Sequence, residues 1–121
     1  MNRQMWVGID LDGTLSQGYQ EQIGPPIPQI VAVAKQLLSA GIEVRIFTAR
    51  ASGGRLMSDP VRAWSKAVFG TVLPVTNVKT MECLLIIDDK ALSIQPNTGR
   101  FRTESEMFEA LHTVIARYGK R

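Results

Sequence analysis

The sequence predicts an α/β domain built around a mainly parallel β-sheet of about five strands. Short apolar runs alternate along the chain with segments whose apolar residues recur at helical spacing, which is the pattern of α/β folds. Two of the runs, MWVGI at 5–9 and LLII at 84–87, are apolar or glycine at every position. Strands of that kind are expected where both faces of a sheet are covered.

The strands and the first two helices can be placed in order. Strands are expected at 5–9, 42–47, 72–76 and 84–87, with a short fifth strand at 91–94. The first helix follows the pair Pro25-Pro26 and stops at Gly41, because proline favours a first helical turn and glycine an end. The second helix is expected to open at Asp59-Pro60, with Asp59 as its N-cap, and to end at Gly70.

A third helix closes the chain. The turn sequence PNTG at 96–99 precedes it, and Thr103 with Glu106 forms the T-x-x-E pattern of a capping box. One apolar stripe is then expected along this helix. Its members are Met107, Leu111, Val114, Ile115 and Tyr118.

Length and composition predict one soluble domain, 1–121. Apolar residues make up 45% and charged residues 21% of the chain, and no repeat or linker divides it. No apolar stretch approaches the roughly 20 residues that span a bilayer, so we expect a cytoplasmic protein without membrane contact. The single cysteine, Cys83, excludes an intramolecular disulfide and is expected to be a small buried apolar residue. The net charge of +3 suits an anionic substrate without establishing one.

Residues whose side chains could take part in catalysis or ligand binding follow four of the predicted strands. Ligands of parallel α/β sheets bind beyond the carboxyl ends of the strands, so these residues are expected to meet at one edge. They are Asp10, Asp12, Gly13 and Thr14 after the first strand, Thr48 and Arg50 after the second, Asn77 and Lys79 after the third, and Asp88, Asp89 and Lys90 after the fourth. Any one of them alone fits a turn, a cap or a solvated loop, but a structural explanation must account for all four groups at once.

The charges of these residues indicate a chemistry. Several carboxylates at one point repel each other unless a cation lies among them, and hard oxygen ligands suit Mg²⁺. A carboxylate can attack phosphorus to form an aspartyl-phosphate, and a second carboxyl can serve as acid and base. Hydroxyl, lysine and turn N–H groups can stabilise charge on phosphoryl oxygens. The sequence has a candidate for each of these functions.

The same residues resemble the four ordered motifs of the haloacid dehalogenase superfamily. DLDGTL at 10–15, FTAR at 47–50, Lys79 and IDD at 87–89 are similar to them, in the same order. The resemblance implies a Rossmann-like three-layer α/β/α fold with the first strand near the centre of the sheet. It implies a Mg²⁺-dependent phosphomonoester hydrolase, with Asp10 as nucleophile.

The resemblance also assigns the other roles. Asp12 would be the general acid/base, with its backbone carbonyl on the metal, and Thr48 would bind the phosphoryl group. Lys79 would neutralise the nucleophile and the phosphate, while Asp88 and Asp89 would complete the metal site directly or through water. The expected metal set is therefore Asp10, Asp12, Asp88 and Asp89.

The lysine assignment has competitors. Lys79 lies only nine residues before Asp88, too close for the helix that many family members carry there. Lys66, inside the second predicted helix, is a weaker alternative, and Lys90 is expected to screen the acidic pair from outside. For Arg50 and Arg55, which flank a flexible loop, contact with substrate and a solvated position are left open.

The chain has no room for the cap domain of larger family members. Only SQGYQEQIG, residues 16–24, separates the first motif from the first helix. Short loops, a second subunit of a homodimer or a bulky substrate must then exclude water. Tyr19 in this segment either lies on a substrate or packs on its own loop. The substrate is a phosphorylated small molecule or a macromolecule such as a nucleic-acid 3′ end.

Two other functions use similar residues. A phospho-acceptor signalling module also combines acids, a threonine and a lysine on a parallel sheet, although the order of motifs here fits it poorly. A non-catalytic HAD-like protein that binds a phosphorylated partner is the third alternative. It would need no nucleophile and acid together.

Overall fold

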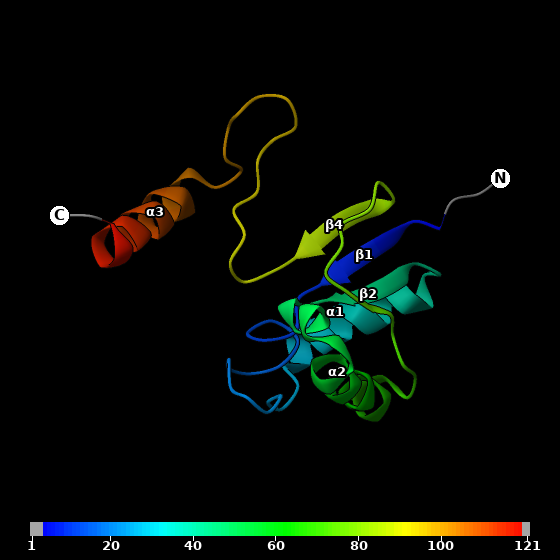
Figure 1. Ribbon diagram of the computed structural model, residues 1–121. Coiled ribbons are helices and arrows are strands. Elements are labelled where there is room, and N and C mark those ends of the chain that lie inside the picture. The colour runs from blue at the N-terminus through cyan, green and yellow to red at the C-terminus, as the bar shows by residue number, and fades with distance from the viewer. Residues whose placement is uncertain (1–3, 120–121) are drawn as a thin grey trace. The chain divides into compact units, whose positions relative to one another are not determined.

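The computed structural model describes residues 4–119. The chain divides into two compact units, Met1–Asp89 and Lys90–Arg121, and each is described by itself. The first unit contains a parallel sheet with its flanking helices, and the second contains the last helix (Figure 1). All the motifs at the predicted strand ends except Lys90 fall in the first unit.

The sheet of the first unit has four parallel strands in the order β3-β2-β1-β4. They are β1 (Trp6–Ile9), β2 (Glu43–Phe47), β3 (Val75–Thr76) and β4 (Cys83–Ile87). β1 is an internal strand, and its last residue, Ile9, stands opposite Ile46 of β2 and Ile87 of β4. The carboxyl ends of these three strands therefore lie at one edge of the sheet, as the sequence predicts.

Both helices of this unit cover the same face of the sheet (Figure 1). They are α1 (Pro28–Ser39) and α2 (Gly54–Phe69), and α2 is preceded by the 3₁₀ helix η1 (Ala49–Gly53). Alternate residues of the strands point toward these helices and form the core with them. The buried core residues are Val7, Ile9, Leu11, Leu15, Val31, Ala34, Val44, Ile46, Val61 and Leu73.

The opposite face of the sheet carries a stacked pair of aromatic side chains. Trp6 is fully buried there, stacked on Phe47 at 6.3 Å between ring centroids and covered by the Arg45 guanidinium at 4.6 Å. Its indole N–H donates a 2.9 Å hydrogen bond to the Thr80 hydroxyl. Among the described residues of the first unit, no helix packs on this face, so the unit by itself contains two layers, and the expected third layer stays a prediction.

Burial confirms one of the two expected central strands and corrects the other. Every residue of β1 is buried, as its apolar sequence predicts. β4 is an edge strand, and Leu84 and Leu85 are 54% and 55% exposed. The prediction that LLII is covered on both faces is therefore wrong for this unit, because the side chains of Leu84 and Leu85, which point to opposite faces, are both more than half exposed. Cys83, expected to be buried, is half-buried.

The second helix begins earlier than predicted. α2 starts at Gly54, and Asp59 and Pro60 lie inside it. The cap lies upstream instead: the Thr48 hydroxyl accepts a hydrogen bond from the Arg50 N–H and starts η1, which leads into α2. Asp59-Pro60 imitates a helix start because proline suits a first turn, but here the preceding turn is already helical.

The second unit contains α3 (Glu104–Tyr118) and no further sheet strand. Thr103 is the N-cap as predicted, but its side chain makes no capping hydrogen bond. The expected fifth strand at 91–94 is absent from the described residues: Ile94 forms only one isolated bridge, with Phe101, around the PNTG turn. The sheet therefore has four strands rather than five.

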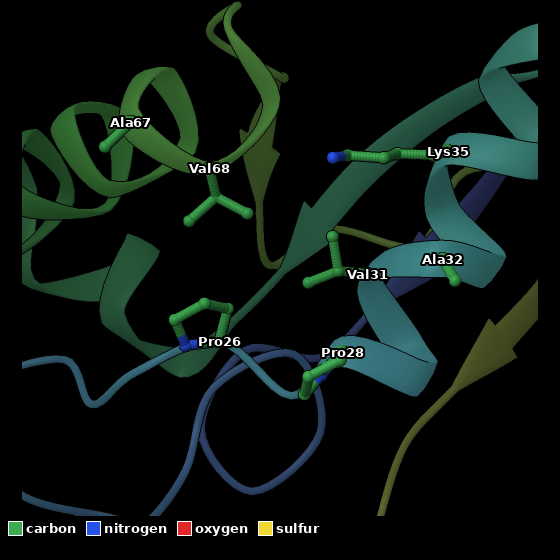
Figure 2. Close-up of a pocket in the computed structure, with 7 residues that line it drawn as sticks. All are labelled: Pro26, Pro28, Val31, Ala32, Lys35, Ala67 and Val68. Atoms are coloured by element: carbon green, nitrogen blue, oxygen red, sulfur yellow. The ribbon is translucent and has the colours of Figure 1, made fainter.

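Two further observations complete the fold. A hollow of about 430 Å³ lies between α1 and α2 and is lined mainly by proline, alanine and valine side chains, with Lys35 reaching toward it (Figure 2). Among the described residues, no helix combines the length and apolar character needed to cross a membrane.

Candidate functional site

The loop after β1 is folded tightly against the end of the sheet. Asp10 continues the strand, since its N–H donates to the Ile87 carbonyl at 2.9 Å. Leu11 and Leu15 are fully buried and anchor the loop in the core. Gly13 between them has a φ of +86°, a conformation that glycine adopts without strain. Acidic and apolar residues therefore alternate here because the apolar ones hold the acids at the sheet edge.

Three carboxylates meet at this edge. One oxygen atom from each of Asp10, Asp88 and Asp89 can be chosen so that all three lie within 4.8 Å of one another. Asp10 and Asp88 are half-buried, and Asp89 is exposed. The structure thus brings together the acids after β1 and β4, as expected from the parallel arrangement of these strands.

The crowding of these acids changes their protonation. Burial, a hydrogen bond with Asp89 and the charges of Asp88 and Asp89 raise the pKa of Asp10 to about 7. Burial opposes ionisation of Asp89 as well, but hydrogen bonds with Tyr19, Asp10 and Thr14 hold its pKa below the usual value. In the absence of a cation and below a pH of about 7, the pair of Asp10 and Asp89 therefore holds one proton, mainly on Asp10.

Two hydroxyl groups contact the acidic cluster. The buried Thr14 hydroxyl lies 3.4 Å from an oxygen of Asp10 and 3.2 Å from an oxygen of Asp89, so its one proton is shared between them. The Tyr19 hydroxyl donates to the other oxygen of Asp89, and this hydrogen bond raises the pKa of Tyr19 to about 12. The sequence analysis expects Tyr19 either on a substrate or packed on its own loop, and its contact with Asp89 is neither of these.

Asp12 lies outside the cluster and is held by Arg50. The Arg50 Nε and one terminal nitrogen donate to the two oxygens of Asp12, each at 2.8 Å. The guanidinium also donates to the backbone carbonyls of Gln20 and Glu21, at 2.6 and 2.9 Å. Arg50 therefore engages both carboxylate oxygens of Asp12. The expected contact of Asp12 with a metal is through its backbone carbonyl, so it stays a prediction.

The segment 16–24, here called the flap, is fixed at both ends. Ser16 and Pro26 form an antiparallel bridge, and the Gln17 N–H donates to the Pro25 carbonyl at 2.9 Å. Near the other end the Trp64 indole N–H donates to the Gly24 carbonyl at 3.0 Å. Arg50 holds the middle of the flap, so this arginine joins the flap to Asp12.

Thr48 lies at the end of β2 and is almost fully buried. Its N–H donates to the Thr76 carbonyl at 2.9 Å, and its hydroxyl accepts from the Arg50 N–H at 3.2 Å. Accepting a hydrogen bond uses an oxygen lone pair and not the hydroxyl proton, so Thr48 retains a proton that it can donate to an anion.

The three lysines considered for the catalytic role, Lys66, Lys79 and Lys90, lie in different environments. Lys79 is exposed, and no ion pair links it to a carboxylate of the described residues. Lys66 donates to the Gly70 carbonyl at the end of its own helix, at 3.1 Å. Lys90 begins the second unit. The contacts described above join neither Lys79 nor Lys66 to the acidic cluster, and the expected role of Lys79 stays a prediction.

The donor set fits a hard divalent cation. Carboxylate oxygens are the preferred ligands of Mg²⁺ and Ca²⁺, and a cation among Asp10, Asp88 and Asp89 would remove the repulsion that keeps Asp10 protonated. The set has no nitrogen or sulfur donor among the described residues, which disfavours Zn²⁺. The cluster alone does not distinguish Mg²⁺ from other hard cations.

Comparison with known proteins defines the fold. No family model matches the chain, and no curated protein matches it. Among solved structures, the chain is similar to one described as that of a conserved protein coded by a locus from Bacteroides thetaiotaomicron, with a TM-score of 0.58 and 21% identity over 92% of each chain. Together with the four-stranded parallel sheet, this likeness fits a Rossmann-like α/β fold.

Three contacts of the site were not predicted: those of Thr14, Arg50 and Tyr19. Thr14 was placed at the strand end without a role, although its position in DGT puts a small hydroxyl one turn from Asp10. For Arg50 the sequence leaves both substrate contact and a solvated position open. The only sequence feature that points to the site is its place two residues after Thr48 in TAR. A long side chain can reach partners far along the sequence, so its partner is not visible in a local pattern.

Proposed function

We propose that the protein is a Mg²⁺-dependent phosphomonoester hydrolase that acts through an aspartyl-phosphate on Asp10, as the resemblance to haloacid dehalogenases implies. The observation that supports it best is the cluster of Asp10, Asp88 and Asp89 beyond the ends of β1 and β4. A further acid, Asp12, lies two residues from Asp10 and is paired with Arg50. A bound Mg²⁺ would neutralise phosphate oxygens and the neighbouring carboxylates.

Asp10 would attack first. Before this attack, Asp12 would release one oxygen from Arg50 and take up a proton from solvent. One carboxylate oxygen of Asp10 then forms a bond to phosphorus while the bond from phosphorus to the ester oxygen breaks, and the departing oxygen takes that proton from Asp12. Water then attacks the phosphorus and gives its proton to Asp12, which releases inorganic phosphate and restores Asp10. The Asp10 proton must leave before attack, and a cation on Asp88 and Asp89 favours that loss.

Asp12 can exchange a proton with substrate only if Arg50 gives up one of its two hydrogen bonds. Both oxygens of Asp12 accept from the guanidinium in this structure. The carbonyls of Gln20 and Glu21 bind the same guanidinium. Movement of the flap would therefore change how Arg50 holds Asp12. We infer that Arg50 is a positioning residue for the acid/base rather than a catalytic one.

Thr48 and the backbone of the 10–14 loop would bind the phosphoryl oxygens. The Thr48 hydroxyl has a proton to donate, and its N-cap position fixes its direction. Lys79 is retained as the cation that approaches the nucleophile on substrate binding. The flap, residues 16–24, is too short to form a separate cap domain between Leu15 and Pro25, so the proposed site has no such cap there.

The first test is hydrolysis of 4-nitrophenyl phosphate with and without Mg²⁺. We expect activity that disappears in excess chelator and falls at least about a thousandfold in Asp10→Asn. Asp59→Asn is the matched control, because Asp59 is an exposed aspartate on α2 paired with Arg62. Full activity of Asp10→Asn, or equal loss of activity in both variants, would exclude Asp10 as the nucleophile.

Rapid quenching followed by mass spectrometry separates the alternatives. A phosphatase should show phospho-Asp10 that turns over within the catalytic cycle. A phosphorylated protein that persists for minutes would instead support a signalling module. Binding of a phosphate ester with no covalent intermediate and no release of phosphate would support the non-catalytic alternative.

A further inference from the structure

An apolar hollow of about 680 Å³ lies between the flap and residues 56–64 of α2. Six apolar residues line it: Ile23, Leu56, Met57, Pro60, Ala63 and Trp64. Its polar lining consists of Glu21, Gln22 and Arg50. This hollow, here called the flap pocket, is separate from the hollow between α1 and α2.

Arg50 connects the flap pocket to the candidate active site. Arg50 lines the pocket, and its guanidinium holds both carboxylate oxygens of Asp12 at 2.8 Å. In the proposed reaction Asp12 gives its proton to the departing alcohol, so that alcohol must come close to Asp12. The flap pocket is therefore next to the place where the organic part of the substrate would lie.

One hydrogen bond fixes the side of the pocket formed by Trp64 and the flap, and the other side is more open. The Trp64 indole is half-buried and hydrogen-bonded to Gly24, which fixes the flap against α2. Leu56 is 89% exposed and Met57 is 40% exposed, so the rim presents large apolar side chains to solvent. Such a surface gains free energy when an apolar group covers it.

We propose that the flap pocket binds the leaving group of the substrate, and that this group is an aromatic or similarly flat apolar alcohol. The assignment rests on the proposed function, which places the phosphate at Asp10 and the departing alcohol on the side of Asp12. A sugar would bring several hydroxyl groups that need hydrogen-bond partners, whereas most of the pocket lining is apolar. Monoesters of aromatic alcohols match it better.

Two phosphonates that cannot be hydrolysed test the pocket without turnover. Calorimetry with Mg²⁺ present compares 1-naphthylmethylphosphonate with methylphosphonate, which share the anionic group. We expect the naphthyl compound to bind at least about tenfold more tightly, since it adds apolar area for burial. The ratio of the two dissociation constants measures the pocket and cancels effects on the anion site.

Ala63→Glu and Ala67→Glu provide a matched pair of variants. Both alanines are exposed on α2, one turn apart, and only Ala63 lines the flap pocket. We expect the naphthyl preference to fall at least about fivefold in Ala63→Glu, because the ring would have to desolvate a carboxylate. Ala67→Glu carries the same charge change and should keep the wild-type ratio.

The outcomes separate the pocket from the reaction. Equal affinity for the two phosphonates, or equal effects of the two variants on the ratio, would overturn the pocket assignment even if Asp10-dependent hydrolysis is observed. A naphthyl preference lost only in Ala63→Glu supports the pocket, and it does so even if the protein hydrolyses nothing. Failure of the Asp10→Asn test bears on the proposed reaction alone.

Discussion

Arg50 and Asp12 form a two-point ion pair across 38 residues of sequence, and the same guanidinium holds the flap through the carbonyls of Gln20 and Glu21. Paired nitrogens of arginine match a carboxylate in a way that the single ammonium of lysine does not. Burial is partial: the side chains of Arg50 and Asp12 are 12% and 20% exposed. Their geometry makes this pair the link between flap position and the acid/base.

Replacing Arg50 by lysine should therefore impair catalysis more than binding. We expect kcat to fall about 10- to 100-fold with a smaller change in KM, because Asp12 is misplaced while the phosphate contacts remain. Hydrogen exchange of the flap amides should become faster, since the carbonyl contacts are lost. Arg55→Lys is the control, as Arg55 is exposed and outside these contacts. Equal kinetics for the two variants would contradict this role.

Asp10→Asn should alter the pH dependence of stability. The raised pKa of about 7 means that the folded protein binds a proton more tightly than the unfolded chain, whose aspartates titrate near 4. Stability of the wild type must then decline as pH rises from about 4 to about 7 and level off above that. The asparagine variant lacks this decline.

The two proteins should thus unfold alike near pH 4, and the variant should be more stable at pH 8, by about 1–2 kcal/mol after allowing for solvent screening. Urea unfolding in chelator at both pH values measures the difference. A wild type that is equally or more stable than the variant at pH 8 would contradict the crowding of charge at Asp10.

Mg²⁺ should stabilise the wild type and release protons. A cation that binds only the folded protein raises the midpoint of thermal unfolding in a concentration-dependent way, here by several degrees at millimolar Mg²⁺. Near pH 6.5, binding should also displace the proton held by Asp10. Asp89→Asn should lose most of the thermal shift, while Asp59→Asn should keep it. A shift that is the same in both variants would place the ion elsewhere.

Gly8 should be needed for the close approach of β1, β4 and the Trp6 ring. A methyl group added at Gly8 would lie 2.7 Å from Ile86 Cδ1 and 2.9 Å from an atom of the Trp6 ring, which is closer than such atoms pack. We expect Gly8→Ala to cost about 1–3 kcal/mol in urea unfolding. Adding Ile86→Val removes the nearest atom and should restore part of the loss. Strict additivity of the two changes would argue against the contact.

The sequence predicted the acidic cluster because it depends on few features. The apolar run of β1 ends at Ile9 and that of β4 ends at Ile87, and parallel pairing alone puts Asp10 beside the acids after β4. The neighbours of long side chains depend on loop conformation instead. That is why the Arg50–Asp12 pair and the contact of Tyr19 with Asp89 were not predicted.

The errors in the fold have similar physical causes. The start of α2 was misplaced because Pro60 satisfies a local rule for helix starts, while the actual start follows from the Thr48 cap. Residues 91–94 are apolar enough for a strand, but a strand needs a neighbour, and only one isolated bridge forms there. Composition specifies propensity, and pairing decides between the alternatives.

The positions of the two tryptophans give the protein a built-in optical readout. Trp6 is sealed in the sheet under Arg45, whereas Trp64 faces the flap pocket. Their emission should therefore differ, with Trp6 following the unfolding of the sheet and Trp64 responding to whatever enters the pocket. With Trp6 or Trp64 replaced by phenylalanine in turn, fluorescence of the two single-tryptophan variants could follow ligand entry and folding separately.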